Sequence, residues 1–216
     1  MNKAANYKRI SETNPGPGRV PVLADEEEQK SPPPDKEEIN GRFLKTRTIL
    51  LSGEVNKELA EKVIKQLLLM EAENDEPIRI FIDSPGGDVD AGFAIFDMIR
   101  FVKPEVYEVG MGLVASVAAL ILLAVPRDHR VGLPNSHYLI HQPWAGLLRG
   151  VATDIEIHAK EMEKCRSRIN RIIAGETGIA LDRIEKDTDR DYWLSAEESL
   201  EYGLISRIIT RRDELC

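Results

Sequence analysis

The chain has 216 residues, of which 42% are hydrophobic and 31% are charged, and it carries a formal net charge of −8. This length and composition are typical of one globular domain with a sizeable core, with or without a tail. Because an acidic chain gains nothing from releasing counterions at phosphate groups, the charge argues against a nucleic-acid partner and against binding to anionic membranes.

Cysteine usage and the start of the chain indicate the compartment. Cys165 and Cys216 are too few for a disulfide framework or a cysteine metal cluster. Both are expected to be free thiols, which fits a reducing environment. The first ten residues lack the apolar core of a signal peptide. These features predict a cytoplasmic protein.

Residues 1–40 are predicted to form a disordered N-terminal tail, acidic and rich in proline, ahead of a folded domain over residues 41–216. Its six prolines disfavour regular structure, and residues 25–38 hold seven acidic residues against two lysines. Such a segment cannot bury enough apolar surface to offset the entropy that is lost on ordering. The alternatives are a removable pro-segment or a docking arm.

Strands and helices are predicted to alternate from about residue 42. The first half contains predicted strands over residues 48–51, 78–82 and 106–111, and predicted helices over residues 56–70, 91–101 and from Ser116 onward. The longest uncharged stretch, residues 109–125, is 17 residues long. Because a membrane-spanning helix needs roughly 18–20 apolar residues, a buried strand followed by a buried helix is the predicted structure.

The second half continues the pattern, and the whole order predicts an α/β fold. Its predicted elements are a strand over residues 137–141, a long helix that begins with a capping box at Thr153 and Glu156 and ends near Gly175, a helix that begins with a capping box at Ser195 and Glu198 and ends at Gly203, and a strand over residues 207–210.

Ser116 lies where a predicted strand ends and a predicted helix begins. The N–H groups in the first turn of a helix have no partner within the helix, so they can face a negative oxygen. This arrangement fits a serine nucleophile with an adjacent oxyanion site. A serine that caps the helix is the simpler alternative.

The turn Ser84-Pro85-Gly86-Gly87 follows the strand over residues 78–82. Its two glycines allow close backbone approach, so their amides could complete an oxyanion hole or hold an extended peptide. A tight strand-to-helix turn is the alternative. The sequence has no phosphate-loop lysine and no GxGxxG motif, so nucleotide binding is not expected.

His141 is the candidate general base, because it ends a strand beside a proline turn that can hold one orientation. His137 lies four residues earlier, about 13 Å away in an extended segment, too far to share a metal ion. Asp187, Asp189 and Asp191 follow later, and any of the three could orient the histidine. Spacing does not choose among them.

The chain resembles the ClpP family of ATP-dependent serine peptidases in five segments that occur in family order between residues 42 and 210: IDSPGGDVDAGFAIFDMI, GMGLVASVAAL, LPNSHYLIHQP, ATDIEIHAKE and DTDRDYWLSAEESLEYGLI. The resemblance implies the ClpP/crotonase-like ββα superhelix with a protruding handle, made of a strand and the long helix from Thr153. It assigns the roles of nucleophile to Ser116, general base to His141, orienting carboxylate to Asp191, and oxyanion-hole amides to Gly87 and Val117.

The same resemblance implies an assembly of two stacked seven-membered rings that enclose a chamber, with Asp189 and Arg190 at positions of contact between the rings. Unfolded protein substrates would arrive from a ring-shaped AAA+ Clp unfoldase. ATP would be consumed there, so neither a cofactor nor a metal is expected in this chain.

Two features depart from the family pattern. Val117-Ala118 stands where the family usually has Met-Gly, and residues 25–38 are acidic where members carry an apolar axial segment. A divergent paralogue that works beside a second ClpP subunit is therefore expected. The alternatives are a catalytically weak or inactive structural subunit of a mixed ring, and a crotonase-type acyl-CoA enzyme without a serine nucleophile.

Overall fold

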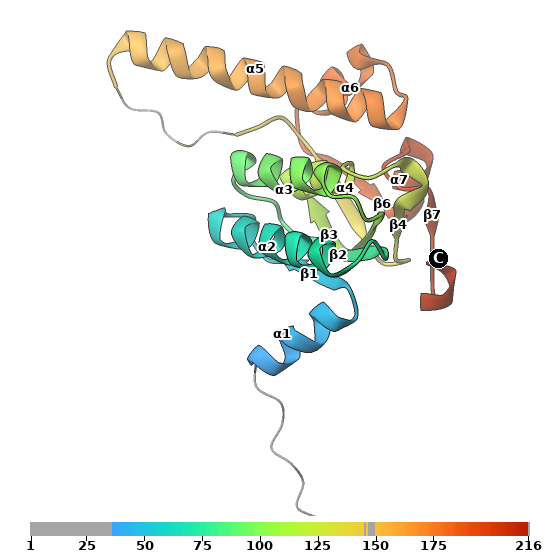
Figure 1. The fold of residues 1–216 in the computed structure, drawn as a ribbon. Helices are drawn as coiled ribbons and strands as arrows, with labels where there is room; N and C mark the ends of the chain where they lie inside the picture. The colour runs from blue at the N-terminus through green and yellow to red at the C-terminus, as the bar shows by residue number, and fades with distance from the viewer. Residues whose placement is uncertain (1–35, 145, 147–149, 216) are drawn as a thin grey trace, which may run out of the picture. The chain divides into compact units, whose positions relative to one another are not determined.

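The structure, a computed structural model, describes residues 36–144, 146 and 150–215. Strands and helices alternate along most of these residues (Figure 1), which confirms the predicted α/β class. The strands are β1 (Thr48–Ser52), β2 (Ile78–Ser84), β3 (Val106–Ala115), β4 (Arg130–Gly132), β5 (His137–Ile140), β6 (Tyr192–Ser195) and β7 (Arg207–Ile208). The α-helices are α1 (Lys36–Lys45), α2 (Lys57–Glu73), α3 (Val89–Phe101), α4 (Val117–Leu122), α5 (Ala152–Thr177), α6 (Leu181–Asp187) and α7 (Ala196–Tyr202), and η1 (Arg127–His129) and η2 (Arg212–Glu214) are short 3₁₀ helices.

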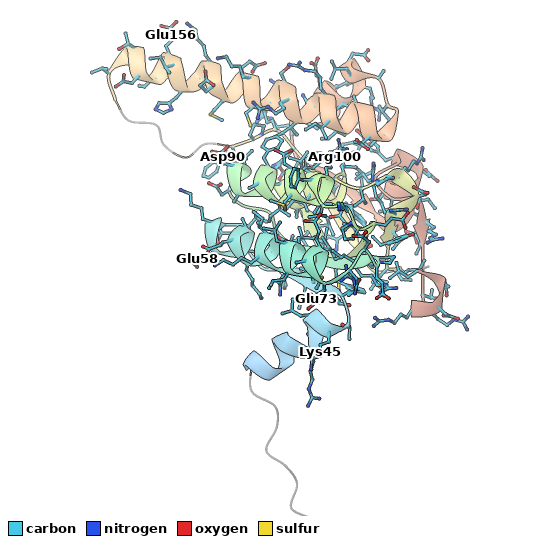
Figure 2. All side chains as sticks on the ribbon, viewed as in Figure 1. Lys45, Glu58, Glu73, Asp90, Arg100 and Glu156 are labelled. Atoms are coloured by element: carbon cyan, nitrogen blue, oxygen red, sulfur yellow. The ribbon has the colours of Figure 1, made fainter. Side chains whose placement is uncertain are left out.

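A parallel run of strands in the order β1-β2-β3-β4-β7 forms the centre of the fold. Along β2, fully or nearly fully buried residues alternate with partly buried ones, as expected for a strand with one face in the core. Ile80 and Ile82 belong to one hydrophobic cluster with Val63 of α2 and Ile95 of α3. Side chains fill the space between helices and strands (Figure 2).

Strand β3 changes its neighbour half-way along. Residues 108–110 pair with β4, whereas residues 113–115 pair with β5. Between the two halves, Gly112 has a φ of 55°, a left-handed conformation that glycine adopts readily. Because β5 also pairs with β6 in the antiparallel sense, the second half of β3 begins a second group of strands, and the candidate site lies at their ends.

The uncharged stretch over residues 109–125 forms the rest of β3 and then α4, which is buried along its whole length. The prediction of a buried strand followed by a buried helix is confirmed, although the strand extends to Ala115 and the helix is only six residues long. In the described residues, no helix is long and apolar enough to cross a membrane.

Of the two predicted capping boxes, one is confirmed and one is wrong. At α7, the Ser195 side chain accepts from the Glu198 backbone, and the Glu198 side chain accepts from the Ser195 backbone. At α5, the N-cap is Val151 without a side-chain bond, so Thr153 already lies inside the helix. The expected end near Gly175 is also wrong, because α5 continues to a left-handed C-cap at Gly178.

The predicted tail, residues 1–40, lies outside the described residues as far as residue 35. Helix α1 begins at Lys36, so the expected boundary between residues 40 and 41 falls within that helix. Strands β4 and β6 and helix α6 were not expected from the sequence, since each has at most seven residues and shows little periodicity.

The long helix that was expected for the handle is α5, which has 26 residues. The strand before it, β5, ends at Ile140. Between these two elements, the described residues belong to neither a strand nor a helix.

Candidate active site

Ser116 is the single residue between β3 and α4, and its backbone has φ 58° and ψ −124°. For a residue other than glycine this conformation costs about 1–3 kcal/mol, so the surroundings must hold it. Its N–H donates to the carbonyl of Leu139 on β5 at 2.8 Å, and its carbonyl accepts from Ala119 in α4. The Ser116 side chain makes no capping bond. The hydroxyl is therefore available to another partner.

The strand registers bring His141 and Asp191 together. Ile140 of β5 pairs with Tyr192 of β6 as the last pair of an antiparallel ladder. His141 is the next residue after Ile140, and Asp191 is the residue before Tyr192, so the two lie opposite each other just beyond the ladder. Asp189 and Asp191 follow α6 in one loop, but only Asp191 has this position.

The three side chains form a connected row. Ser116 Oγ lies 2.8 Å from His141 Nε2, and His141 Nδ1 lies 3.0 Å from Asp191 Oδ1. Both hydrogen bonds can form at once when Nδ1 carries the imidazole proton: Nδ1–H donates to the carboxylate, and Nε2 accepts from the serine hydroxyl. The His141 side chain is 25% exposed and that of Asp191 is 64% exposed. This geometry suits a hydroxyl nucleophile, a base and an orienting carboxylate.

The glycine turn lies directly against the serine. A Cβ built on Gly86 would be 2.7 Å from Ser116 Cβ and 3.1 Å from Val117 N. A Cβ built on Gly87 would be 2.2 Å from the carbonyl oxygen of Val55. Neither position has room for a side chain, which explains why glycines stand at both positions.

Two backbone N–H groups are candidates to receive a negative oxygen. Val117 N–H is the first in α4 and has no acceptor within that helix. Gly87 forms a parallel bridge with Val55, whose bonds use the carbonyl of Gly86 and the N–H of Asp88. In such a bridge, the N–H of Gly87 itself points away from Val55. Both N–H groups predicted from the resemblance are thus free of these local bonds.

A small apolar pocket lies beside Ser116, with a volume of ≈ 20 Å³. That volume holds little more than one water molecule. Apart from Ser116 and His141, its lining is apolar and consists of Val89, Val117, Leu120, Ile140, Pro143, Ile169 and Ile173. Such a pocket can accept a small apolar side chain next to a reacting bond.

Asp189 and Arg190 lie in the same loop as Asp191. Asp189 Oδ1 is 3.4 Å from Arg166 Nη2 on α5. Both residues line an open surface hollow with a volume of ≈ 500 Å³, which also includes His141 and Asp191. Their contact with a second ring stays a prediction.

The remaining candidates lie elsewhere or were missed. His137 stacks on Trp193 across β5 and β6, with ring centroids 5.8 Å apart, and it takes no part in the row of Ser116, His141 and Asp191. No group of three or more potential metal ligands occurs among the residues for which the structure gives positions. Sequence reasoning did not single out Gln142, which follows the predicted strand over residues 137–141 and precedes Pro143.

Comparisons with known proteins agree with this architecture. The family model for Clp protease matches residues 32–212. The chain is 60% identical over 190 residues to the ATP-dependent Clp protease proteolytic subunit 2 of Treponema denticola, which covers 88% of this chain and 94% of that protein. It is 49% identical over 191 residues to the ATP-dependent Clp protease proteolytic subunit 3 of Rhizobium johnstonii, covering 88% and 98% of the two chains.

A solved structure also matches. A ClpP1 mutant from Listeria monocytogenes superposes with a TM-score of 0.77 and 50% sequence identity, covering 82% of this chain and 99% of that chain. The α/β architecture with its parallel sheet is therefore the ClpP fold, as the resemblance implied.

Proposed function

The chain belongs to the Clp protease family, and on that premise we propose that it is a serine endopeptidase in which Ser116 is the nucleophile, His141 the general base and Asp191 the orienting carboxylate. It acts in the cytoplasm on peptide bonds of unfolded proteins. One observation carries the proposal: the continuous row from Ser116 Oγ to His141 Nε2 at 2.8 Å, and from His141 Nδ1 to Asp191 Oδ1 at 3.0 Å.

The reaction follows from the positions of the protons. Ser116 Oγ attacks the carbonyl carbon of the peptide while His141 Nε2 takes the hydroxyl proton. Asp191 stays ionised, holds the Nδ1–H tautomer and stabilises the imidazolium. The negative oxygen of the tetrahedral intermediate accepts hydrogen bonds from the N–H groups of Val117 and Gly87.

The intermediate then collapses. His141 Nε2 returns its proton to the leaving amine, and an acyl ester remains on Ser116. Water enters, His141 takes a proton from it, and a second tetrahedral intermediate breaks down to the free acid and the serine hydroxyl. No step requires a cofactor.

The assembly is part of the proposal. We expect two stacked heptameric rings that enclose the sites and receive unfolded chains from an AAA+ Clp unfoldase, with Asp189 and Arg190 in contact between the rings. Exposed apolar side chains support contacts of α5 and the segment before it with other subunits: Trp144 is 84% exposed, Val151 64% and Ile157 59%. Val151 is the N-cap of α5 and Ile157 lies in its first two turns, at the end of the helix where Figure 2 labels Glu156.

A second candidate is a catalytically weak or inactive subunit of a mixed ring. It is favoured by the pocket beside Ser116, which has a volume of only ≈ 20 Å³. It is also in keeping with the names of the relatives, which are numbered as proteolytic subunits 2 and 3. Co-purification of a second ClpP paralogue, with little activity of the isolated chain, would support this candidate.

The decisive experiment measures hydrolysis of a short fluorogenic peptide and labelling by a serine-directed fluorophosphonate. Both are expected for the wild type and absent for Ser116→Ala. Ser206→Ala is the matched control, because it removes a serine hydroxyl that donates to the Arg130 carbonyl. Peptide hydrolysis that survives Ser116→Ala would overturn the proposal. Acyl-CoA turnover without labelling would favour a crotonase-type enzyme instead.

A further inference from the structure

Gln142 joins the segment that carries the base to the segment that carries the acid. It follows His141 directly, and its backbone N–H donates to the carbonyl of Thr188 at 2.7 Å. Its side-chain Nε2 donates to the carbonyl of Asp189, also at 2.7 Å. These two carbonyls stand three and two residues before Asp191. A single residue therefore binds both segments with two short bonds.

Both the donor residue and the acceptor loop of these two hydrogen bonds are held in place. Pro143 limits the backbone of Gln142 to extended conformations, which reduces the alternatives open to its donors. On the other side, Thr188 is fully buried. Its Oγ1 lies 2.9 Å from Asn170 Oδ1 on α5 and 2.8 Å from the carbonyl of Ile184 in α6. Gln142 thus attaches His141 to a loop that two helices already hold.

The Asp191 carboxylate itself has little support from the surrounding structure. The β5–β6 ladder ends at the pair of Ile140 and Tyr192, one residue short of His141 and Asp191. The Asp191 side chain is 64% exposed. Within the described part of the chain, the Asp191 carboxylate accepts one side-chain hydrogen bond, from His141. The position of the Asp191 carboxylate therefore depends on how its backbone is held against His141.

We infer that Gln142 is a positioning residue for the proposed peptidase reaction, on which this inference rests: its side-chain amide holds the Asp189 carbonyl and thereby keeps His141 within hydrogen-bond distance of Asp191. Loss of the amide donor lets the loop before Asp191 separate from the segment after His141. The base then loses its orientation, whereas the apolar pocket beside Ser116, which Gln142 does not line, keeps its shape.

Two variants of the full-length assembled protein test this role. Gln142→Met keeps the length of the side chain and removes both the donor and the acceptor. Gln142→Glu keeps the shape, but an ionised carboxylate cannot donate to a carbonyl and also adds a negative charge near Asp191. We expect kcat to fall about 10- to 100-fold, more for the Glu variant, with KM unchanged. Ser206→Ala, which also removes a side-chain bond to a carbonyl, is expected to keep kcat.

Crystal structures of the wild type and Gln142→Met separate this inference from the proposed function. A lengthened distance from His141 Nδ1 to Asp191 Oδ1 in the variant supports positioning even if the wild type hydrolyses no peptide. An unchanged distance with unchanged kcat overturns the inference and leaves the proposed function intact. A purely structural role would lower the thermal midpoint of both variants and leave kcat and the distance as they are, which also overturns it.

Discussion

The side chain of Val117 occupies the space that Gly92 leaves open: a Cβ built on Gly92 in α3 would lie 2.0 Å from Val117 Cγ2. Val117 begins α4 directly after Ser116, and it is almost fully buried. The absence of a side chain at one position of α3 therefore decides where the first turn of α4, and with it the candidate oxyanion N–H, can lie.

Gly92→Ala is expected to impair both stability and activity. The added methyl group overlaps Val117, and overpacking of a well-packed core costs about 1–3 kcal/mol. The shift of α4 should also lower kcat for peptide hydrolysis. Gly175→Ala is the control, because Gly175 lies in α5 with no heavy atom within 4 Å of a built Cβ. It should raise the thermal midpoint, since alanine favours a helix by up to about 1 kcal/mol over glycine. Failure of a Gly92→Ala/Val117→Ala double variant to recover activity would contradict this explanation.

Val117→Ala should widen the range of accepted substrates. Apart from Ser116, His141 and Pro143, the pocket beside Ser116 is lined by branched apolar side chains, and its volume is ≈ 20 Å³. We expect the wild type to prefer alanine or another small apolar residue on the acyl side of the scissile bond over leucine or phenylalanine. Removing two methyl groups should shift the ratio of kcat/KM values for leucine and alanine peptides about 10-fold toward leucine. An unchanged ratio would show that the pocket opens by itself when substrate binds.

Asp191→Asn should remove most of the activity while leaving the chain folded. An amide can donate its N–H to His141 Nδ1 and so favours the wrong tautomer, a change that costs about 10⁴ in kcat in the trypsin-type triad. Asp187→Asn is the matched control, because Asp187 accepts from Arg183 and Tyr202 and does not touch His141. That control should lower the thermal midpoint and keep kcat. Equal losses of kcat in the two variants would exclude a special role for Asp191.

Glu108 should make the free energy of unfolding fall with rising pH. The residue is fully buried on β3, and neither carboxyl oxygen has a hydrogen-bond partner among the described residues. Burial raises the pKa of Glu108 well above its ordinary value, although nearby Arg130 opposes the shift. Arg130 itself is paired with Glu176, which also binds Arg100 on α3.

The direction of this pH effect follows from proton binding. Above about pH 4.3 the unfolded chain releases the Glu108 proton, whereas the folded protein keeps it until its raised pKa is reached. Glu108→Gln removes this dependence. The difference between the thermal midpoints of the variant and the wild type should therefore increase in favour of the variant from pH 5 to pH 9. For Glu58→Gln, at an exposed position of α2, the difference in thermal midpoint from the wild type should not change with pH. A constant difference across this pH range would mean that Glu108 titrates normally.

The sequence identified the alternation of strands and helices because long buried strands and amphipathic helices have clear periodicity. It could not choose among Asp187, Asp189 and Asp191 from spacing, since the choice depends on the register of a strand of only four residues. Asp187 turns to Arg183, Asp189 lies near Arg166, and Asp191 faces His141. Only the resemblance to the family selected Asp191 in advance.

Other features were beyond sequence reasoning for related reasons. The start of α5 was misplaced because Thr153 and Glu156 have the spacing of a capping box but already lie within the first turns. The role of Gln142 depends on backbone carbonyl groups of residues 188 and 189. Because every residue has such a group, residue types do not reveal which carbonyl accepts the bond. The full burial of Glu108 contradicts the usual exposure of glutamate, so residue type alone could not place it in the core.

The change of neighbour along β3 has a mechanical consequence. Ser116 is attached to the end of β3, and β5, which leads to His141, is bonded along the same final segment. The backbone of Ser116 and the strand that leads to His141 are therefore joined by hydrogen bonds, and a displacement of this segment is expected to move both. Gly112, with its φ of 55°, lies between this segment and the half of β3 that pairs with β4.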